Sequence, residues 1–266
     1  MPPAAHEARA ANLRMYDAPE WAGAVDAFWA RVVARLRAHG LADIPDRLTR
    51  DRALDDIWTD PRLLLAQTCG WPLVTRLAGR VAVVATPRHT LPGCAGATHR
   101  AFIVVRADDP ADSPAALRGR RFALNGWDSN TGMNLARALF APLARDGRFF
   151  GAIVVTGAHR ASLAAVAEGR ADAASVDCVT YGLLCRHAPG AVAGLRVLAE
   201  TPATPALPFI TRAGAPPNEL AALRAALDQP DAALAFAGVT VLPEGAYDAL
   251  SGLAAAAARL GYPTLS

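Results

Sequence analysis

The most specific chemical feature of this sequence is a turn of small polar residues between a predicted strand and a predicted helix. The turn lies in the segment NGWDSNTGMN (125–134), directly after the strand-like run RFAL. Ser129, Asn130 and Thr131 bring hydroxyl and amide groups to it, and Gly132 permits close approach to the backbone. A helix start exposes free backbone N–H groups and the positive end of the helix dipole, so the turn predicts an anion site. Helix capping by Ser129 or Asn130 is the alternative, and the pattern alone does not separate the two.

A second strand–turn–helix segment, VVTGAHRAS (154–162), repeats this arrangement. In open α/β sheets, ligands lie beyond the carboxyl ends of the strands, which is where both turns fall. His159 and Ser162 come at the start of the second helix, so we expect them to face the same anion. A solvent-exposed histidine without a role is the alternative for His159.

Three more polar residues follow predicted strands. Asp177 ends one strand before a helix, and a plain helix cap is the alternative function for its carboxylate. Facing a ligand, Asp177 would repel a simple dianion and select a ligand that also carries a cation or a hydroxyl group. Gln67 and Thr68 end the apolar run LLLAQ (63–67), and their position makes them candidate ligand contacts.

The sequence contains none of the common catalytic motifs. It has no G-x-S-x-G segment, P-loop, H-E-x-x-H segment or dinucleotide fingerprint. Its 6 histidines and 4 cysteines show no metal-ligand spacing, so we expect no metal and no cofactor. A nucleophilic pair of His159 with Cys69 or Cys178 stays open, without a local signature. Cys69 and Cys94 are either paired or free buried thiols. The sequence favours binding over catalysis.

Composition narrows the classes of partner. With 266 residues, 53% of them hydrophobic, the chain needs neither disulfides nor a metal to form a core. The formal net charge is only +3, and no arginine cluster is dense enough for a nucleic-acid surface. The apolar runs fall short of the ~18 residues of a membrane-spanning helix. Residues 1–20 carry charges where a secretion signal needs an apolar stretch, so we expect no leader there and no membrane insertion.

Strand-like and helix-like runs alternate along the chain, which predicts an α/β fold of two three-layer αβα lobes. The predicted strands are 11–16, a short one from Leu48, 63–67, 81–85, 98–106, 122–124, 153–156, 171–176 and 195–198. The main predicted helices are 21–39, 130–144, 162–168, 179–186, 219–227 and 246–260. We expect residues 1–100 and 205–266 to form the first lobe and 101–204 the second, joined by a two-strand hinge. The helices after Pro208 are expected to pack on the first lobe.

Several segments together resemble the phosphonate/phosphate-binding family of ABC-transporter substrate-binding proteins, over most of the chain. They are MYDAPE, LAQTCGWPL, PGCAGATHRAFIVVR, LRGRRFALNGWDSNTGMN, VTGAHRASLAAVAEGRADAASVDCVTYGLL and PALPFIT. The resemblance implies a type II periplasmic-binding-protein fold. It also implies that the hydroxyl-rich turn and His159 hold an oxyanion. An aromatic residue near the first strand, here Tyr16, and the acid Asp177 would help to hold the rest of the ligand.

The predicted function is capture of a small oxyanion, a phosphonate, phosphate or related group, between the lobes for an ABC transporter. The resemblance implies a permease as partner and a periplasmic location, and we expect a monomer. Two features depart from the family. The family is normally exported, whereas this sequence shows no leader, and the segments around Cys69 and Cys94 are divergent, so that a carboxylate would also fit. The alternative is a cytosolic enzyme on the same fold that acts on a small anionic metabolite.

Overall fold

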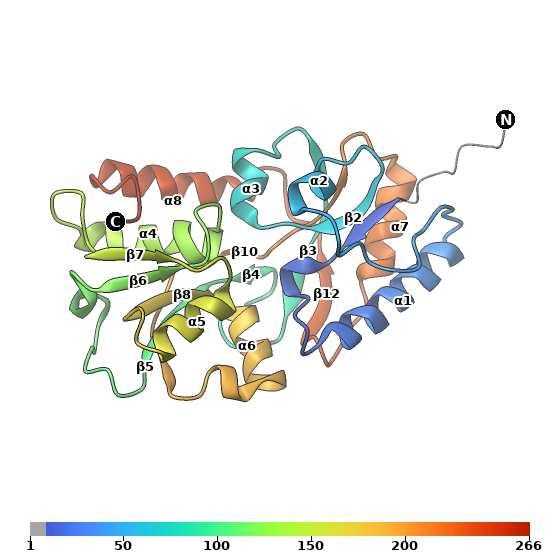
Figure 1. Cartoon of the computed structure of the whole chain (residues 1–266). Coiled ribbons are helices and arrows are strands. Elements are labelled where there is room, and N and C mark those ends of the chain that lie inside the picture. Colours follow the sequence, from blue (N-terminus) through green and yellow to red (C-terminus); the bar gives the residue numbers. More distant parts are fainter. Residues whose placement is uncertain (1–8) are drawn as a thin grey trace. The chain divides into compact units, whose positions relative to one another are not determined.

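The computed structural model describes residues 9–266, in which short strands and helices alternate along the chain. The chain forms two compact units, each built from segments that are far apart in sequence (Figure 1). The first unit contains the described residues up to Thr68, Thr75–Arg88 and Leu207–Leu242. The second unit contains Cys69–Val74, His89–Ala206 and Pro243–Ser266. The predicted α/β class is confirmed.

The first unit is built on a mixed five-stranded sheet. In spatial order its strands are β1 (Ala10–Asn12), β2 (Leu63–Gln67), β11 (Phe209–Arg212), β3 (Val81–His89) and β12 (Phe236–Thr240). Its helices are α1 (Ala22–Ala38), α2 (Leu54–Trp58) and α7 (Pro217–Leu227). β1 pairs in parallel with β2, whereas β11 runs antiparallel to both of its neighbours. Every residue of β2 is buried, so both faces of the sheet are covered there.

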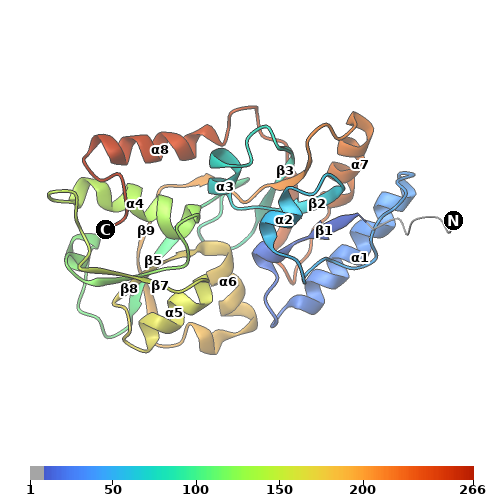
Figure 2. The ribbon, with the colours of Figure 1, turned by 45° about the horizontal axis from the view of Figure 1, so that its top comes forward.

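The second unit is a three-layer αβα arrangement. In spatial order its strands are β7 (Ala152–Val155), β6 (Arg121–Leu124), β8 (Ala173–Asp177), β5 (Ala101–Arg106) and β9 (Leu195–Glu200). Its helices are α4 (Leu135–Phe140), α5 (His159–Ala167), α6 (Cys178–His187) and α8 (Asp248–Arg259), and the short α3 (Gly70–Thr75) begins in this unit. Helices α4 and α8 lie on one side of the sheet, and α5 and α6 lie on the other (Figures 1 and 2).

Side-chain alternation along the strands explains these layers. In β6, Phe122 points into an aromatic core with Phe140 of α4, whose ring centroid lies 6.1 Å away. In β5, Ile103 joins the same core, whereas the preceding residue, Phe102, meets Tyr181 of α6 edge-on at 5.6 Å. Successive residues of a strand face opposite sides, so each strand here anchors a helix layer on each face.

A short two-stranded ribbon completes the second unit. Its strands β4 (Thr98–His99) and β10 (Thr204–Pro205) are antiparallel, and Thr204 lies opposite His99. Because β5 follows β4 after a single residue, the ribbon holds His99 directly beside the end of the main sheet.

Several sequence predictions differ from the structure. Residues 243–266 belong to the second unit rather than the first lobe, because Ala257 and Tyr262 are buried in its core, and this unit begins before residue 101. β12 was not predicted. No strand starts at Leu48, and the strand predicted at 11–16 ends at Asn12. The two-strand hinge stays a prediction.

Two further expectations concern a leader segment and membrane insertion. The segment expected to lack a leader, residues 1–20, includes residues 1–8, which lie outside the described part. Within residues 9–266, no helix has both the length and the apolar character that crossing a membrane requires.

Candidate functional site

The polar turn before α4 is a single π-helical turn, Asn130–Asn134, that begins at a capping serine. The Ser129 hydroxyl oxygen accepts the N–H of Gly132 at 2.9 Å, which is the capping alternative recognised in the sequence. A β-carbon on Gly132 would lie 1.7 Å from Oδ1 of Asn125, so a larger residue here would displace the Asn125 side chain. π-turns are rare and occur often at functional sites.

Asn130 fixes the turn to the rest of the second unit. Its side-chain amide donates to the hydroxyl of Thr204 in β10 at 3.1 Å, and its backbone N–H donates to the Cys69 sulfur at 3.2 Å. Its side-chain oxygen Oδ1 accepts from the side-chain amide of Asn134 at 3.0 Å. Asn130 is completely buried. With its polar atoms engaged in this way, Asn130 positions the turn, and its contact with a ligand stays a prediction.

Thr131 and His159 meet where the π-turn and α5 begin. The Thr131 hydroxyl lies 3.0 Å from Nε2 of His159, and the backbone carbonyl of Thr131 accepts from Ser175 in β8 at 2.6 Å. Ala158, which precedes α5, provides no side-chain cap for the first amides of that helix. The structure therefore brings together two of the predicted site residues at two neighbouring helix starts.

Burial sets the protonation of His159. Desolvation lowers the pKa of its imidazole below the ordinary value, and the charge of Asp177 and the backbone carbonyl of Ser175 act in the opposite direction. The ring is therefore largely neutral near pH 7. Which of the two partners donates in the Thr131–His159 contact depends on the tautomer of this neutral ring.

Ser162 contacts a residue of its own strand–helix turn. Its hydroxyl lies 2.7 Å from that of Thr156, at the turn between β7 and α5, and the residue is completely buried. The structure thus places Ser162 in the packing of its own strand–helix turn. A direct contact of Ser162 with a ligand stays a prediction.

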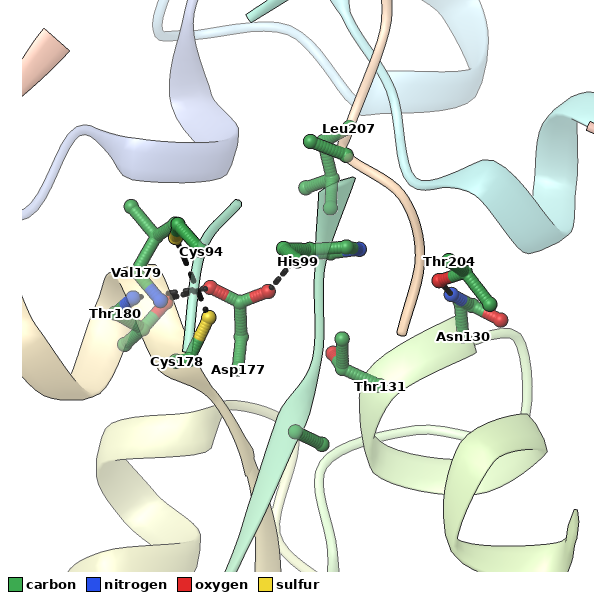
Figure 3. A network of polar contacts seen from close by, with 12 residues as sticks. Cys94, His99, Asn130, Thr131, Asp177, Cys178, Val179, Thr180, Thr204 and Leu207 are labelled. Atoms are coloured by element: carbon green, nitrogen blue, oxygen red, sulfur yellow. Dashed lines mark hydrogen bonds and ion pairs between the residues drawn. The ribbon is translucent and has the colours of Figure 1, made fainter. Parts of the chain in front are cut away.

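Asp177 forms the second polar centre of this unit, and its carboxylate is fully engaged (Figure 3). Oδ1 accepts the backbone N–H groups of Val179 at 2.9 Å and Thr180 at 3.0 Å, so Asp177 caps α6. Oδ2 lies 2.9 Å from Nδ1 of His99, and the side chains of His99 and Asp177 are 0% and 3% exposed. The two atoms form a close polar contact that is completely buried and is an ion pair when His99 is protonated.

The electrostatics of this pair favour an ionised carboxylate. Burial alone would raise the pKa of Asp177, but the adjacent His99 and the α6 amides outweigh it and lower the pKa to about 2. Asp177 therefore carries its negative charge at neutral pH and shares it with groups of its own chain.

His99 is the site residue that sequence reasoning missed. It is the second residue of the strongest predicted strand, 98–106, where a polar residue is typical of an ordinary strand end. The only available signal was a histidine at the start of a buried strand. Pairing of β4 with β10 then sets His99 opposite Thr204, the residue that holds Asn130.

The candidates of the first unit lie on their own sheet. The Gln67 side-chain amide donates to the carbonyl of Leu207 at 3.1 Å, and the Thr68 N–H donates to the carbonyl of Pro208 at 3.1 Å. Tyr16 is buried at the end of a short 3-10 helix. The role of Tyr16, Gln67 and Thr68 in binding stays a prediction.

The cysteines are free thiols, and Cys94 lies against Cys178 rather than Cys69, with 3.5 Å between the two sulfurs. Burial raises the pKa of Cys69 to about 11, which keeps that thiol protonated and unlike an activated nucleophile. Among residues 9–266, no group of three or more His, Cys, Asp or Glu side chains could hold a metal ion.

Known structures with this architecture define the class of protein. The chain shares the type II periplasmic-binding-protein fold with PhnD1 from Prochlorococcus marinus in complex with methylphosphonate, at a TM-score of 0.72 and 13% identity, covering 94% of this chain and 97% of the other. A binding-protein component of an ABC phosphonate transporter from Pseudomonas aeruginosa gives 0.70 and 14%, covering 95% and 87%. The periplasmic aliphatic sulphonate-binding protein SsuA from Escherichia coli gives 0.54 and 15%, covering 96% and 85%.

The sequence itself defines the family. Residues 63–236 match the family of ABC-transporter phosphonate periplasmic substrate-binding proteins, and this chain belongs to that family. The resemblance recognised in the sequence is confirmed. No curated protein is similar enough in sequence to count as a match.

Proposed function

We propose that this chain is a substrate-binding protein that captures a small oxyanion for an ABC transporter. The observation that carries the proposal is the meeting of Thr131 and His159, 3.0 Å apart, at two helix starts of one sheet. Helix starts, a hydroxyl and an imidazole are together the donors that an oxyanion prefers. The mechanism has no chemical step: the anion exchanges its hydration shell for donors that are already in place.

The strength of such a site follows from its donors. Charge-assisted hydrogen bonds contribute about 1.5–3 kcal/mol each. Three or four of them contribute about 5–12 kcal/mol before the cost of ordering, and micromolar binding requires a net of about 8 kcal/mol, which the upper part of this range supports. Tyr16, Gln67 and Thr68 of the first unit are proposed as further contacts, and Ser129 and Gly132 as the frame of the turn.

The family narrows the ligand to be tested first. A similar structure is in complex with methylphosphonate, and another belongs to an aliphatic sulphonate-binding protein. Phosphonates are therefore the first candidates for this chain, with phosphate, sulfonates and carboxylates after them. The proposed partner is the permease of an ABC transporter.

A ligand screen tests the proposal. The melting temperature of the purified chain is measured with methylphosphonate, phosphate, methanesulfonate or acetate, and Kd is determined by calorimetry for each ligand that stabilises it. We expect at least one oxyanion to bind, and Thr131→Val to weaken it by about tenfold or more, because the variant keeps the shape and loses the hydroxyl.

Thr264→Val is the matched control, since Thr264 is exposed near the C-terminus. It should leave Kd unchanged. Unaltered binding by Thr131→Val would move the site elsewhere, and failure of all four ligands would refute the proposal. Turnover of a bound ligand would instead favour the enzyme alternative.

A further inference from the structure

The carboxylate of Asp177 has no free oxygen for a ligand cation, because both of its oxygens face groups of the chain. One oxygen accepts two backbone N–H groups of α6, and the other faces Nδ1 of His99 at 2.9 Å. Both side chains are more than nine-tenths buried. To bind an ammonium group, Asp177 would have to give up a partner that is itself buried and would be left without compensation.

The remaining charged and titratable groups of this centre do not offer a substitute. Asp128 is an acid of the loop before the π-turn, but it is exposed. Both oxygens of the buried Asp177 carboxylate face groups of the chain itself, so a bound cation would meet no free carboxylate oxygen there.

The other nitrogen of His99 faces away from Asp177. In Figure 3 it points toward the side on which Asn130 and Thr204 are drawn. Nε2 is buried, and it has no hydrogen-bond partner among residues 9–266. A histidine whose first nitrogen is held by a carboxylate keeps a fixed ring orientation, which suits the second nitrogen for contact with an anion.

We propose that His99 sets the ligand class of this site: by occupying Asp177, it makes the site select oxyanions without an ammonium group over aminated ones. The inference deepens the proposed function and rests on it. It reverses the expectation from the sequence, in which a free Asp177 carboxylate would favour a ligand with a cation. An ammonium group would lose its hydration beside two imidazoles and gain no direct contact with a free carboxylate oxygen.

A pair of ligands of nearly equal size tests this directly. Ethylphosphonate and aminomethylphosphonate differ by a methyl group in place of an ammonium group. We expect calorimetry on the wild-type chain to give at least about tenfold tighter binding of ethylphosphonate. Equal or tighter binding of aminomethylphosphonate would overturn the proposal. So would a site that binds methylphosphonate and excludes both larger ligands.

Substitution of His99 gives an independent reading. His99→Gln removes the imidazole beside Asp177, so the preference for ethylphosphonate should fall by about tenfold or more. A purely structural defect would weaken both ligands alike and leave their ratio unchanged. In the double variant His99→Gln/Asp177→Asn no carboxylate remains, and the preference for ethylphosphonate should return.

The two proposals fail in different ways. If the wild-type chain binds none of methylphosphonate, phosphate, methanesulfonate and acetate, the proposed function is wrong and this inference falls with it. If methylphosphonate binds but the ratio is reversed, or is unaltered by His99→Gln in a variant with a native circular-dichroism spectrum, only the role of His99 is refuted. Should His99→Gln not fold, the wild-type ligand ratio decides.

Discussion

Helices α5 and α6 of the second unit differ in whether a side chain caps their first backbone amides. At α6 the chain supplies its own anion, because Asp177 caps the first amides and is itself held by His99. At α5 the preceding residue is Ala158, which has no side chain able to cap. Both helices follow a strand in the same βα arrangement, so their amides carry similar partial positive charge.

The difference shows what separates a binding site from a structural cap in this fold. A helix start becomes a ligand site where the sequence withholds an acceptor, and it becomes part of the core where the sequence provides one. His159, rather than an acid, stands at the open start. Each helix start can therefore be converted toward the other by one substitution.

The largest effect is expected from removing the side chain that caps α6. Asp177→Ala removes the α6 cap and leaves the buried Nδ1 of His99 without its partner, which should lower the free energy of unfolding by about 3–5 kcal/mol. Urea denaturation measures the loss. The control Asp248→Ala removes an exposed acid from the first turn of α8 and should cost no more than about 1 kcal/mol. Similar losses in the two variants would show that the His99–Asp177 pair is energetically unimportant.

The lowered pKa of Asp177 predicts a loss of folding stability in acid. The pKa of Asp177 is lowered in the folded chain to about 2, from an ordinary value of 3.8. The stabilisation it provides is therefore complete above pH 3.8 and is lost as the pH falls toward 2. Unfolding free energies measured across this interval should fall more steeply for the wild type than for Asp177→Asn. Parallel curves would contradict the assignment.

A smaller effect is expected from introducing a capping side chain before α5. Ala158→Asp places a carboxylate before α5, where the backbone already has the extended conformation of a cap residue. It should weaken oxyanion binding by about tenfold or more, because the protein's own anion then competes for the amides. Stability should rise by about 0.5–2 kcal/mol at the same time. Calorimetry and urea denaturation measure the two effects.

The matched control separates charge from capping. Ala158→Asn has almost the same shape as Ala158→Asp and also caps, but it adds no charge. We expect its effect on Kd to be clearly smaller. If Ala158→Asp leaves the Kd of the bound oxyanion unchanged, the start of α5 takes no part in binding.

Local patterns predicted the elements that carry the turn and His159. Ser129–Asn134 and His159 come a few residues after strands β6 and β7, so the sequence shows both the element and the residue that it positions. Capping is equally local: Ser129 and Asp177 each accept amides within three residues of themselves. Whether a cap leaves room for a ligand is a different question, and neighbouring residues in sequence do not answer it.

The missed features depend on contacts between distant residues. His99 reaches Asp177 because β5 and β8 pair antiparallel, which brings two residues together that are far apart in sequence. Helix α8 packs in the second unit because Tyr262 enters its aromatic core, although the helix follows residues of the first unit. Amphipathic periodicity shows that α8 buries one face, but it does not name the sheet that covers it.

The smallest effect is expected from the protonation of His159, which stands at the start of α5. Burial lowers the pKa of His159 in the free chain, and a bound oxyanion beside the ring would raise it again. Binding would then take up a proton, so the affinity for methylphosphonate should fall as the pH rises from about 6 to 8. Methylphosphonate also titrates in this range, so the informative quantity is the difference between the wild type and His159→Gln. We expect a few-fold steeper decline for the wild type, measured by calorimetry at several pH values.

His39→Gln is the control for this measurement. His39 is exposed after α1, so this variant should show the same pH dependence of Kd as the wild type. Identical curves for the wild type and His159→Gln would exclude His159 from the oxyanion site.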